Sequence, residues 1–171
     1  IQVGSFHRGY VDAVFDKAQF SPRWVLDAKT SGSNGVNVGH IAVVNGIAYS
    51  VSYEKVQGGY GTYAKLHAVN EENGSEIWSY TSLETAQDID YLSSPTVSDG
   101  IIYFSDKVSS SQTDLVALNA MTGVAVFRAP MEAQFGKFQA PIVDEINVYS
   151  SGGRFGGIYA FDKFSGVEKW F

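Results

Sequence analysis

The sequence predicts an all-β fold in which four-stranded antiparallel sheets repeat along the chain. Three observations support this prediction. An eleven-residue frame occurs three times, a short hairpin signal precedes each copy, and the segments around both are rich in Val, Ile, Tyr, Ala and Ser. Residues of these types favour strands that pack on both faces. Because the features recur in the same order, each unit is expected to form one sheet.

The frame reads AVNEENGSEIW at 68–78, ALNAMTGVAVF at 117–127 and AFDKFSGVEKW at 160–170. Each copy has Ala first, Asn or Asp third, Asn, Thr or Ser sixth, Gly seventh and a large aromatic residue eleventh. The third and seventh residues suit a tight turn with a side-chain cap and one positive φ, so the frame predicts a strand, a turn and a second strand. Its marker residues are Ala68, Gly74, Trp78, Ala117, Gly123, Phe127, Ala160, Gly166 and Trp170.

A hairpin precedes each frame. Asn45-Gly46 separates the apolar runs IAVV and IAYSVSY, and Asp99-Gly100 separates SPTVS from IIYFSD. Such dipeptides between apolar runs are strong signals for a two-residue hairpin turn. In the third unit Glu145 stands where Gly is expected, which predicts a looser turn or one of another type.

The repeat length indicates the architecture. The closing aromatic residues Trp24, Trp78, Phe127 and Trp170 lie 54, 49 and 43 residues apart. Four-stranded β-propeller blades have about this period. We therefore expect a β-propeller-type array of four-stranded antiparallel blades, with three full blades and a partial N-terminal one.

The expected boundaries follow from these aromatic residues. Residues 1–23 form an atypical N-terminal segment or partial blade, in which Phe20 replaces the frame Gly. The three repeats cover about 24–77, 78–126 and 127–171.

The frame resembles the tryptophan-docking motif, Ala-x-Asp-x-x-x-Gly-x-x-x-Trp, of the β-propeller repeats in pyrroloquinoline-quinone (PQQ) dehydrogenases and their quinone-free relatives. The resemblance covers residues 24–171. It implies that each Trp ring is held between the Ala of its own frame and the Gly peptide of the neighbouring blade, so that Trp78 would reach Gly123. Phe127 departs from the motif because it lacks the indole N–H, which predicts weaker docking there.

The resemblance also allows a cofactor, because the quinone-dependent enzymes use PQQ, a calcium or lanthanide ion, a catalytic carboxylate and usually an adjacent Cys pair. This chain has no Cys and shows no ligand cluster. No cofactor is therefore expected, with PQQ and calcium as the alternative. The sequence is closer to the quinone-free relatives, namely the propeller lipoprotein of outer-membrane assembly and repeat domains of secreted bacterial proteins.

Strand order places the short turns at one end of the propeller and the long, variable loops at the other. Loops on a rigid scaffold commonly carry binding residues, and aromatic residues with Arg suit a protein or glycan contact. The candidate binding residues on the long loops are Tyr53, Tyr60, Tyr63, Asp88, Asp90, Tyr91, Arg154 and Phe155. The competing interpretation is that some of them only cover the sheet edges.

Other chemistry has little support. Asp88 and Asp90 could share a cation or a proton, but a calcium site needs six to eight oxygens and no loop supplies them. His7, His40 and His67 lack metal spacing, so a hydrogen-bonding or surface role is expected. No Gly-x-Ser-x-Gly elbow indicates a hydrolase. The glycine-rich segments at 59–61 and 152–157 do not lead from a strand into a helix, so no phosphate cradle is expected.

Composition narrows the function. The net charge of −6 offers no basic stripe for nucleic acid, and no apolar run approaches the roughly 20 residues that cross a bilayer. We expect a non-enzymatic binding or scaffold propeller, periplasmic, cell-surface or secreted, with a protein or glycan partner. The alternative is a degenerate quinoprotein oxidoreductase. Three blades cannot close a ring of four to eight, so the remaining blades are expected from a longer chain or from other copies.

Overall fold

The computed structural model describes residues 21–24, 40–55, 62–82, 92–109, 111–132 and 139–171, and the statements below refer to these residues. Their strands form three four-stranded antiparallel sheets, named blades 1, 2 and 3 in chain order. Within each blade the strands pair in sequence order. The predicted all-β architecture of four-stranded antiparallel sheets is confirmed.

The strand bounds are as follows. Blade 1 contains β1 (Ala42–Val44), β2 (Ile47–Lys55), β3 (Thr62–Asn70) and β4 (Glu76–Thr81). Blade 2 contains β5 (Thr96–Ser98), β6 (Ile101–Lys107), β7 (Gln112–Asn119) and β8 (Ala125–Glu132). Blade 3 contains β9 (Ile142–Val143), β10 (Asn147–Ser151), β11 (Ile158–Asp162) and β12 (Glu168–Trp170).

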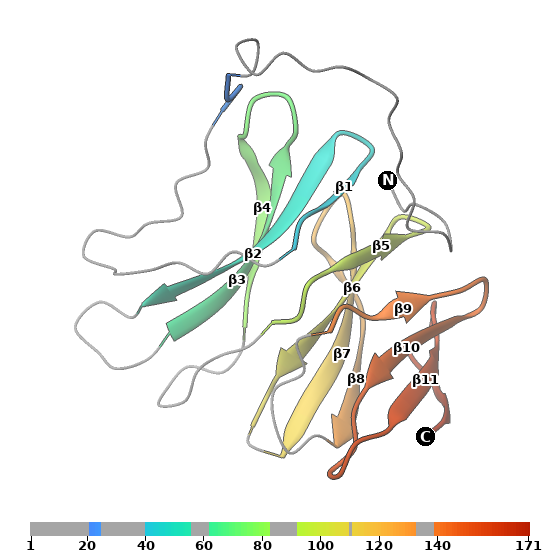
Figure 1. Cartoon of the computed structure of the whole chain (residues 1–171). Coiled ribbons are helices and arrows are strands. Elements are labelled where there is room, and N and C mark those ends of the chain that lie inside the picture. The colour runs from blue at the N-terminus through green and yellow to red at the C-terminus, as the bar shows by residue number, and fades with distance from the viewer. Residues whose placement is uncertain (1–20, 25–39, 56–61, 83–91, 110, 133–138) are drawn as a thin grey trace, which may run out of the picture.

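The three blades lie one after another, and neighbouring blades face each other (Figure 1). Their first strands approach one another, since β1 contacts β5 and β5 contacts β9. The outer strands β4, β8 and β12 end each sheet at the other side. This arrangement places the turns between the third and fourth strands of all blades at one end, called here the short-turn end.

The turn inside each frame has the same hydrogen bonds in all three blades. In blade 2, Asn119 Oδ1 accepts from the backbone N–H groups of Met121 and Thr122, and the N–H of Gly123 donates to the carbonyl of Asn119 at 2.8 Å. Asn70 and Asp162 cap the corresponding turns. For Asp162, the hydrogen bonds from the Ser165 backbone and hydroxyl lower the pKa of the carboxyl to about 2. The third frame residue therefore fixes the turn.

The first hairpins of blades 1 and 2 have the predicted turn. Asn45 and Gly46 have φ of 52° and 78°, and Asp99 and Gly100 have 51° and 75°, as a type I′ turn requires. The third hairpin differs, as the Glu145 substitution predicts. There Asp144 Oδ1 accepts from the backbone N–H groups of Ile146 and Asn147, at 2.8 and 2.7 Å. A side-chain cap thus replaces the positive φ.

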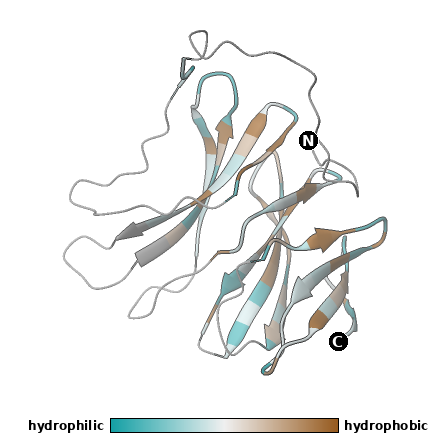
Figure 2. Ribbon diagram, in the orientation of Figure 1, coloured by the Kyte–Doolittle hydropathy of each residue, from teal (hydrophilic) through white to brown (hydrophobic). Residues whose placement is uncertain are grey.

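The core lies between the blades. One cluster joins blades 1 and 2 and includes Tyr49, Leu66, Ile102 and Phe104, all buried. A second joins blades 2 and 3 and includes Tyr103, Leu115, Met131, Val148 and Phe161. The central blade is buried on both faces, so β6 and β7 show continuous burial in place of alternation. Figure 2 shows apolar bands on the strands of each blade and a hydrophilic turn between β3 and β4.

Candidate functional site

The frame aromatic residues lie over the glycine turns of the following blade. A Cβ atom added to Gly123 would stand 2.8 Å from Cδ2 of Trp78, and one added to Gly74 would stand 2.7 Å from Cδ2 of Trp24. The ring of Phe127 approaches Gly166 in the same way. Each of these glycines has a positive φ, and only Gly leaves room for the ring above it.

The indole groups also donate to the next blade. Trp24 Nε1 donates to the carbonyl of Glu71 at 2.8 Å, and Trp78 Nε1 donates to the carbonyl of Ala120 at 2.9 Å. Both acceptors are the fourth residue of the following frame. Within its own blade, each ring is supported by the frame Ala, because Ala68 pairs with Trp78 and Ala117 pairs with Phe127 across the strands.

A Tyr in the second strand of blades 1 and 2 completes this contact, and the sequence analysis missed it. Tyr49 and Tyr103 pair with the frame Ala and donate to the fourth frame residue of the next blade: Tyr49 Oη to the Ala120 carbonyl at 3.0 Å and Tyr103 Oη to the Lys163 carbonyl at 2.9 Å. Burial raises the pKa of Tyr103 to about 12, which keeps this donor protonated. The signal that could have found these residues is a Tyr at the third position of IAY, IIY and NVY.

Two glycines of blade 2 distinguish the need for a positive φ from the need for space beneath an aromatic ring. Gly100→Ala places a Cβ in open space at φ +75°, and Gly123→Ala does so at φ +70° against the Trp78 ring. The first change is expected to lower the free energy of unfolding by about 1–2 kcal/mol, the cost of a left-handed residue. The second should cost about 1–3 kcal/mol more because of the collision. Urea unfolding of both variants measures the difference, and equal losses would contradict the ring contact.

The long-loop end carries an exposed Arg-Phe pair. Arg154 and Phe155 lie at the tip of the loop between β10 and β11, Phe155 is 93% exposed, and the Arg154 guanidinium carbon lies 5.9 Å from the Phe155 ring centroid. The base of the loop is fixed, because Gly152 N–H donates to the Gly157 carbonyl at 3.1 Å and Gly153 N–H donates to the Glu132 carbonyl at 2.6 Å. The tip is therefore presented on an anchored loop.

The other candidate loop residues divide into two groups. Tyr53 is half-buried, and its hydroxyl donates to the Leu92 carbonyl at 2.7 Å, so it links blade 1 to the segment before blade 2. Tyr60, Asp88, Asp90, Tyr91 and the side chain of Tyr63 lie outside the described residues. The structure thus describes three of the candidates and does not bring Tyr53 together with Arg154 and Phe155.

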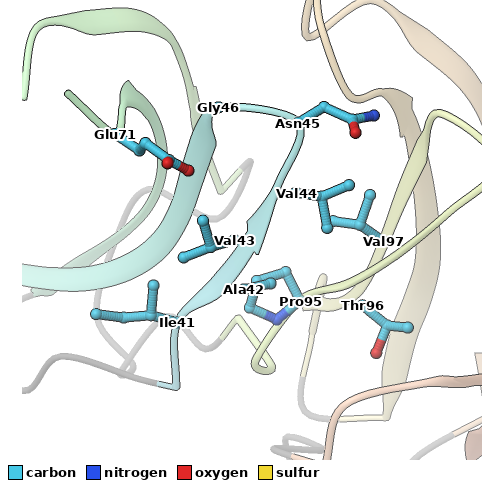
Figure 3. A pocket seen from close by; sticks show the side chains of 10 residues that line it. All are labelled: Ile41, Ala42, Val43, Val44, Asn45, Gly46, Glu71, Pro95, Thr96 and Val97. Carbon is cyan, nitrogen blue, oxygen red and sulfur yellow. The ribbon is translucent and has the colours of Figure 1, made fainter. Parts of the chain in front are cut away.

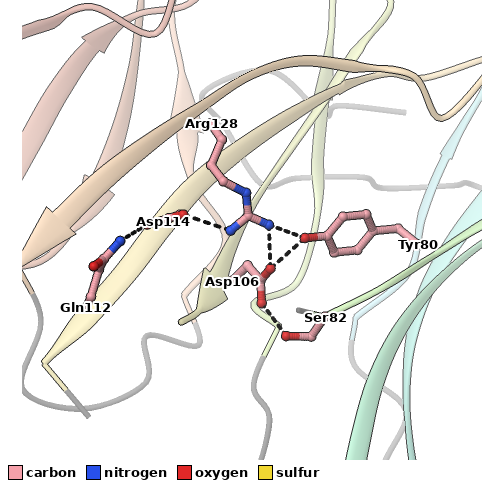
Figure 4. A network of polar contacts seen from close by, with 6 residues as sticks. All are labelled: Tyr80, Ser82, Asp106, Gln112, Asp114 and Arg128. Carbon is pink, nitrogen blue, oxygen red and sulfur yellow. Dashed lines mark hydrogen bonds and ion pairs between the residues drawn. The ribbon is translucent and has the colours of Figure 1, made fainter. Parts of the chain in front are cut away.

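A largely buried ionic network crosses from blade 1 to blade 2 near the long-loop end (Figure 4). Asp106 is fully buried and accepts from Tyr80 Oη at 2.5 Å, Ser82 Oγ at 2.5 Å and Arg128 at 2.7 Å. Arg128 also binds Asp114 at 2.8 Å and contacts the Tyr80 hydroxyl. Burial opposes the charge of Arg128, but its hydrogen bonds to Asp114 and Asp106 outweigh burial and raise its pKa. For Tyr80, burial and then Asp106 raise the pKa.

Ser52, His67 and Glu76 form a second polar chain. Ser52 Oγ lies 2.8 Å from His67 Nε2, and His67 Nδ1 lies 2.8 Å from Glu76 Oε2. The hydrogen bond with His67 is the main cause of the lowered pKa of Glu76. Hydroxyl, imidazole and carboxylate stand in the order of a hydrolytic triad. Ser52 is only 2% exposed, however, so the chain serves as a hydrogen-bonded link between strands, in agreement with the role expected for His67.

An open groove of about 720 Å³ lies between β1 and β5 (Figure 3). Its lining is Ile41, Ala42, Val43, Val44, Asn45, Gly46, Glu71, Pro95, Thr96 and Val97. Among the lining residues that the structure describes, aliphatic side chains dominate and Glu71 is the one charged residue. The described residues contain no group of three or more His, Cys, Asp or Glu that could hold a metal ion.

Comparison with known proteins agrees with the fold. A family model described as outer membrane protein assembly factor BamB matches residues 7–108 and again 65–171. The dehydrogenase subunit of a quinone alcohol dehydrogenase from Gluconacetobacter polyoxogenes is 27% identical over 164 residues, covering 86% of this chain and 20% of that protein.

Two solved structures are also similar. The quinohemoprotein alcohol dehydrogenase from Comamonas testosteroni matches with a TM-score of 0.58 and 22% identity, covering 80% of this chain and 20% of that one. A europium-containing methanol dehydrogenase matches with a TM-score of 0.54 and 18% identity, covering 76% and 23%. The chain therefore spans about a fifth of the length of these relatives.

The repeated blades and the similar structures define the class of protein, which is a β-propeller. Because the family model matches nearly the whole chain, the chain belongs to the BamB-like family of PQQ-like propeller repeats. The resemblance stated from the frame residues is confirmed. The part of the chain that the structure describes contains no helix long and apolar enough to cross a membrane.

Proposed function

We propose that the chain is a non-enzymatic scaffold propeller of a bacterial envelope or secreted protein and contacts a protein partner through its long-loop end. The observation that carries the proposal is Phe155, which is 93% exposed beside Arg154 on an anchored loop. Aromatic residues and Arg dominate the energy of protein contacts. The description of the matching family as an assembly factor supports a protein as the partner and the envelope as the location.

The frame residues have the complementary role in this proposal, which is to join the blades. Trp24, Trp78 and Phe127 each cover a glycine of the next blade. Trp170 has the same position in blade 3, lies 6.0 Å from the Tyr149 ring centroid and is 50% exposed. We propose that a further blade, from a longer chain or another copy, covers this ring with a glycine turn.

Site-specific photocrosslinking tests the proposed contact. A benzophenone amino acid is placed at position 155 and, as a control, at the exposed position 79 on the outer strand β4. In an envelope extract of the native cells, position 155 is expected to give a discrete protein adduct that position 79 does not give. Adding an excess of the wild-type chain without the crosslinker should suppress the adduct by competition. Adding the Phe155→Ala chain in the same excess should not suppress it. Equal labelling at both positions, or binding to a polysaccharide array that Phe155→Ala abolishes, would contradict a protein partner.

A second candidate is a degenerate quinoprotein oxidoreductase, favoured by the 27% identical quinone alcohol dehydrogenase subunit. Against it, the described residues offer no donor cluster for the metal that accompanies the quinone. The two candidates differ in a simple assay. The scaffold predicts that PQQ and calcium together give neither a bound quinone spectrum nor dye reduction with alcohols, whereas the enzyme predicts both.

A further inference from the structure

The short-turn end has an apolar surface that the frame does not require. The turn depends on its first, third, sixth, seventh and eleventh residues, which leaves the fifth and eighth free to vary. In blade 1 these are Glu72 and Ser75. In blades 2 and 3 they are Met121, Val124, Phe164 and Val167, which are between 57% and 71% exposed. Blades 2 and 3 thus have large apolar side chains at solvent-exposed positions of the turn, although blade 1 shows that polar residues fit the same positions.

These residues belong to turns that are tied to one another. The N–H of Ala120 donates to the Gly100 carbonyl at 2.8 Å, and the N–H of Lys163 donates to the carbonyl of Ile146 at 3.1 Å. Lys163 Nζ crosses between the blades and binds Asp99 at 2.8 Å. Ile146, at 66% exposure, therefore adds to the same end. We name Met121, Val124, Ile146, Phe164 and Val167 the turn-end patch.

The rim of the patch is acidic. Asp99, Asp144, Glu145 and Asp162 lie on the turns that carry it, and the first three are exposed. The two cations of these turns and of β12 are already paired, since Lys163 is buried against Asp99 and Lys169 lies 3.4 Å from Asp162. Hydrogen-bond donors favour the ionised form of two of these carboxyls. The hydrogen bond from Lys163 lowers the pKa of Asp99, and hydrogen bonds from the backbone of Asn147 and Ile146 lower the pKa of Asp144.

An apolar surface with an acidic rim selects its partner by charge. We propose that the turn-end patch binds a basic amphipathic segment of another protein, whose apolar face covers the patch and whose Lys or Arg side chains meet the rim. A second copy would bring the same acidic rim against itself, and an anionic membrane would be repelled in the same way. The surface is separate from the long-loop end, so it gives the scaffold a second contact.

The chain supplies its own test variant, because blade 1 shows which residues the turn tolerates. The swap variant carries Met121→Glu, Val124→Ser, Phe164→Glu and Val167→Ser, which are the residues of blade 1 at the same frame positions. The probe is a fluorescent 18-residue helical peptide of Leu and Lys with one apolar face. The wild-type chain is expected to bind it saturably, and the swap variant at least tenfold more weakly in fluorescence anisotropy.

The direction of this change is decisive because the swap adds negative charge. Attraction by charge alone predicts tighter binding of the cationic peptide to the swap variant, and equal or tighter binding overturns the proposal. A control peptide with Ser in place of Leu should bind neither chain well. Ile158→Ser, which changes an exposed apolar residue beside the long loop of blade 3, should leave binding unchanged, and this separates the patch from the long-loop end. An unchanged circular dichroism melt shows that the swap variant is folded.

Two other binding partners of the turn-end patch, a second copy of the chain and a lipid surface, can be distinguished by experiment. Sedimentation at increasing concentration that reveals a dimer lost in the swap variant assigns the patch to a second copy and overturns the proposed partner. Binding to phosphatidylcholine vesicles that the swap abolishes assigns it to a lipid surface and likewise overturns the proposal.

Discussion

Trp78→Ala is expected to lower the free energy of unfolding by about 3–5 kcal/mol, the range for removing a large aromatic side chain from a packed site. Two contacts are lost together. The ring leaves Gly123 uncovered, and the Ala120 carbonyl loses the indole donor at 2.9 Å. The Tyr49 hydroxyl still donates to the same carbonyl at 3.0 Å, so the principal loss is the ring packing between blades 1 and 2. Urea unfolding followed by circular dichroism measures the change.

Two controls are built into the repeat. Trp170→Ala changes the same frame position where the ring is 50% exposed and no described blade covers it. In a monomeric sample of this chain, about 0.5 kcal/mol or less is therefore expected. Trp78→Phe keeps a ring and removes only the N–H, as Phe127 does naturally, and should cost about 1 kcal/mol. If Trp78→Ala and Trp170→Ala cost the same, the ring over Gly123 does not join the blades.

Much of this fold could be predicted because its rules are local. Asn-Gly and Asp-Gly fix hairpin turns within two residues, and the third frame residue caps a turn by bonding to N–H groups two and three residues later. The substitution of Glu145 for Gly signals a different hairpin for the same reason. Even the ring over Gly123 follows from a spacing that repeats.

The rest depends on register between blades, which no local rule supplies. Tyr49 and Tyr103 were missed because their distance from the frame varies with the long loop, although their cross-strand partner is always the frame Ala. Ser52 and His67 lie 15 residues apart and meet only because β2 and β3 pair. Most of the expected binding residues on the long loops fall outside the described residues, so that part of the expectation stays a prediction.

The ionic network shows this limit most clearly. Tyr80, Asp106 and Arg128 come from three strands of two blades, and nothing in their spacing brings them together. At the corresponding positions between blades 2 and 3, Ala129 and Met131 are buried apolar residues. The interface between blades 1 and 2 therefore contains an ionic network, whereas the corresponding part of the interface between blades 2 and 3 is apolar. Each interface matches only a neighbouring blade of the same character. Similar blades can thereby be prevented from pairing out of order.

Asp106→Ala is expected to lower the free energy of unfolding by about 3–5 kcal/mol, because breaking a buried ion pair leaves its partners uncompensated. Tyr80, Ser82 and Arg128 all lose their acceptor on this carboxylate, while Arg128 keeps Asp114. Asp106 is fully buried and 28% of the Arg128 side chain is exposed, so 0.5 M salt should change the loss little. Lys169→Ala, which removes the exposed pair with Asp162, is the control and should cost less than about 1 kcal/mol.

A double-mutant cycle shows whether the network joins the two blades. Tyr80→Phe removes the blade 1 hydroxyl and keeps the ring, whose centroid lies 5.1 Å from that of Phe104. If the hydroxyl acts through Asp106, Tyr80→Phe should cost less in the Asp106→Ala background than in the wild-type chain, with a coupling of about 0.5–3 kcal/mol. Additive losses would mean that Asp106 stabilises blade 2 alone. The two blades would then be held together by Trp78, Tyr49 and the apolar cluster.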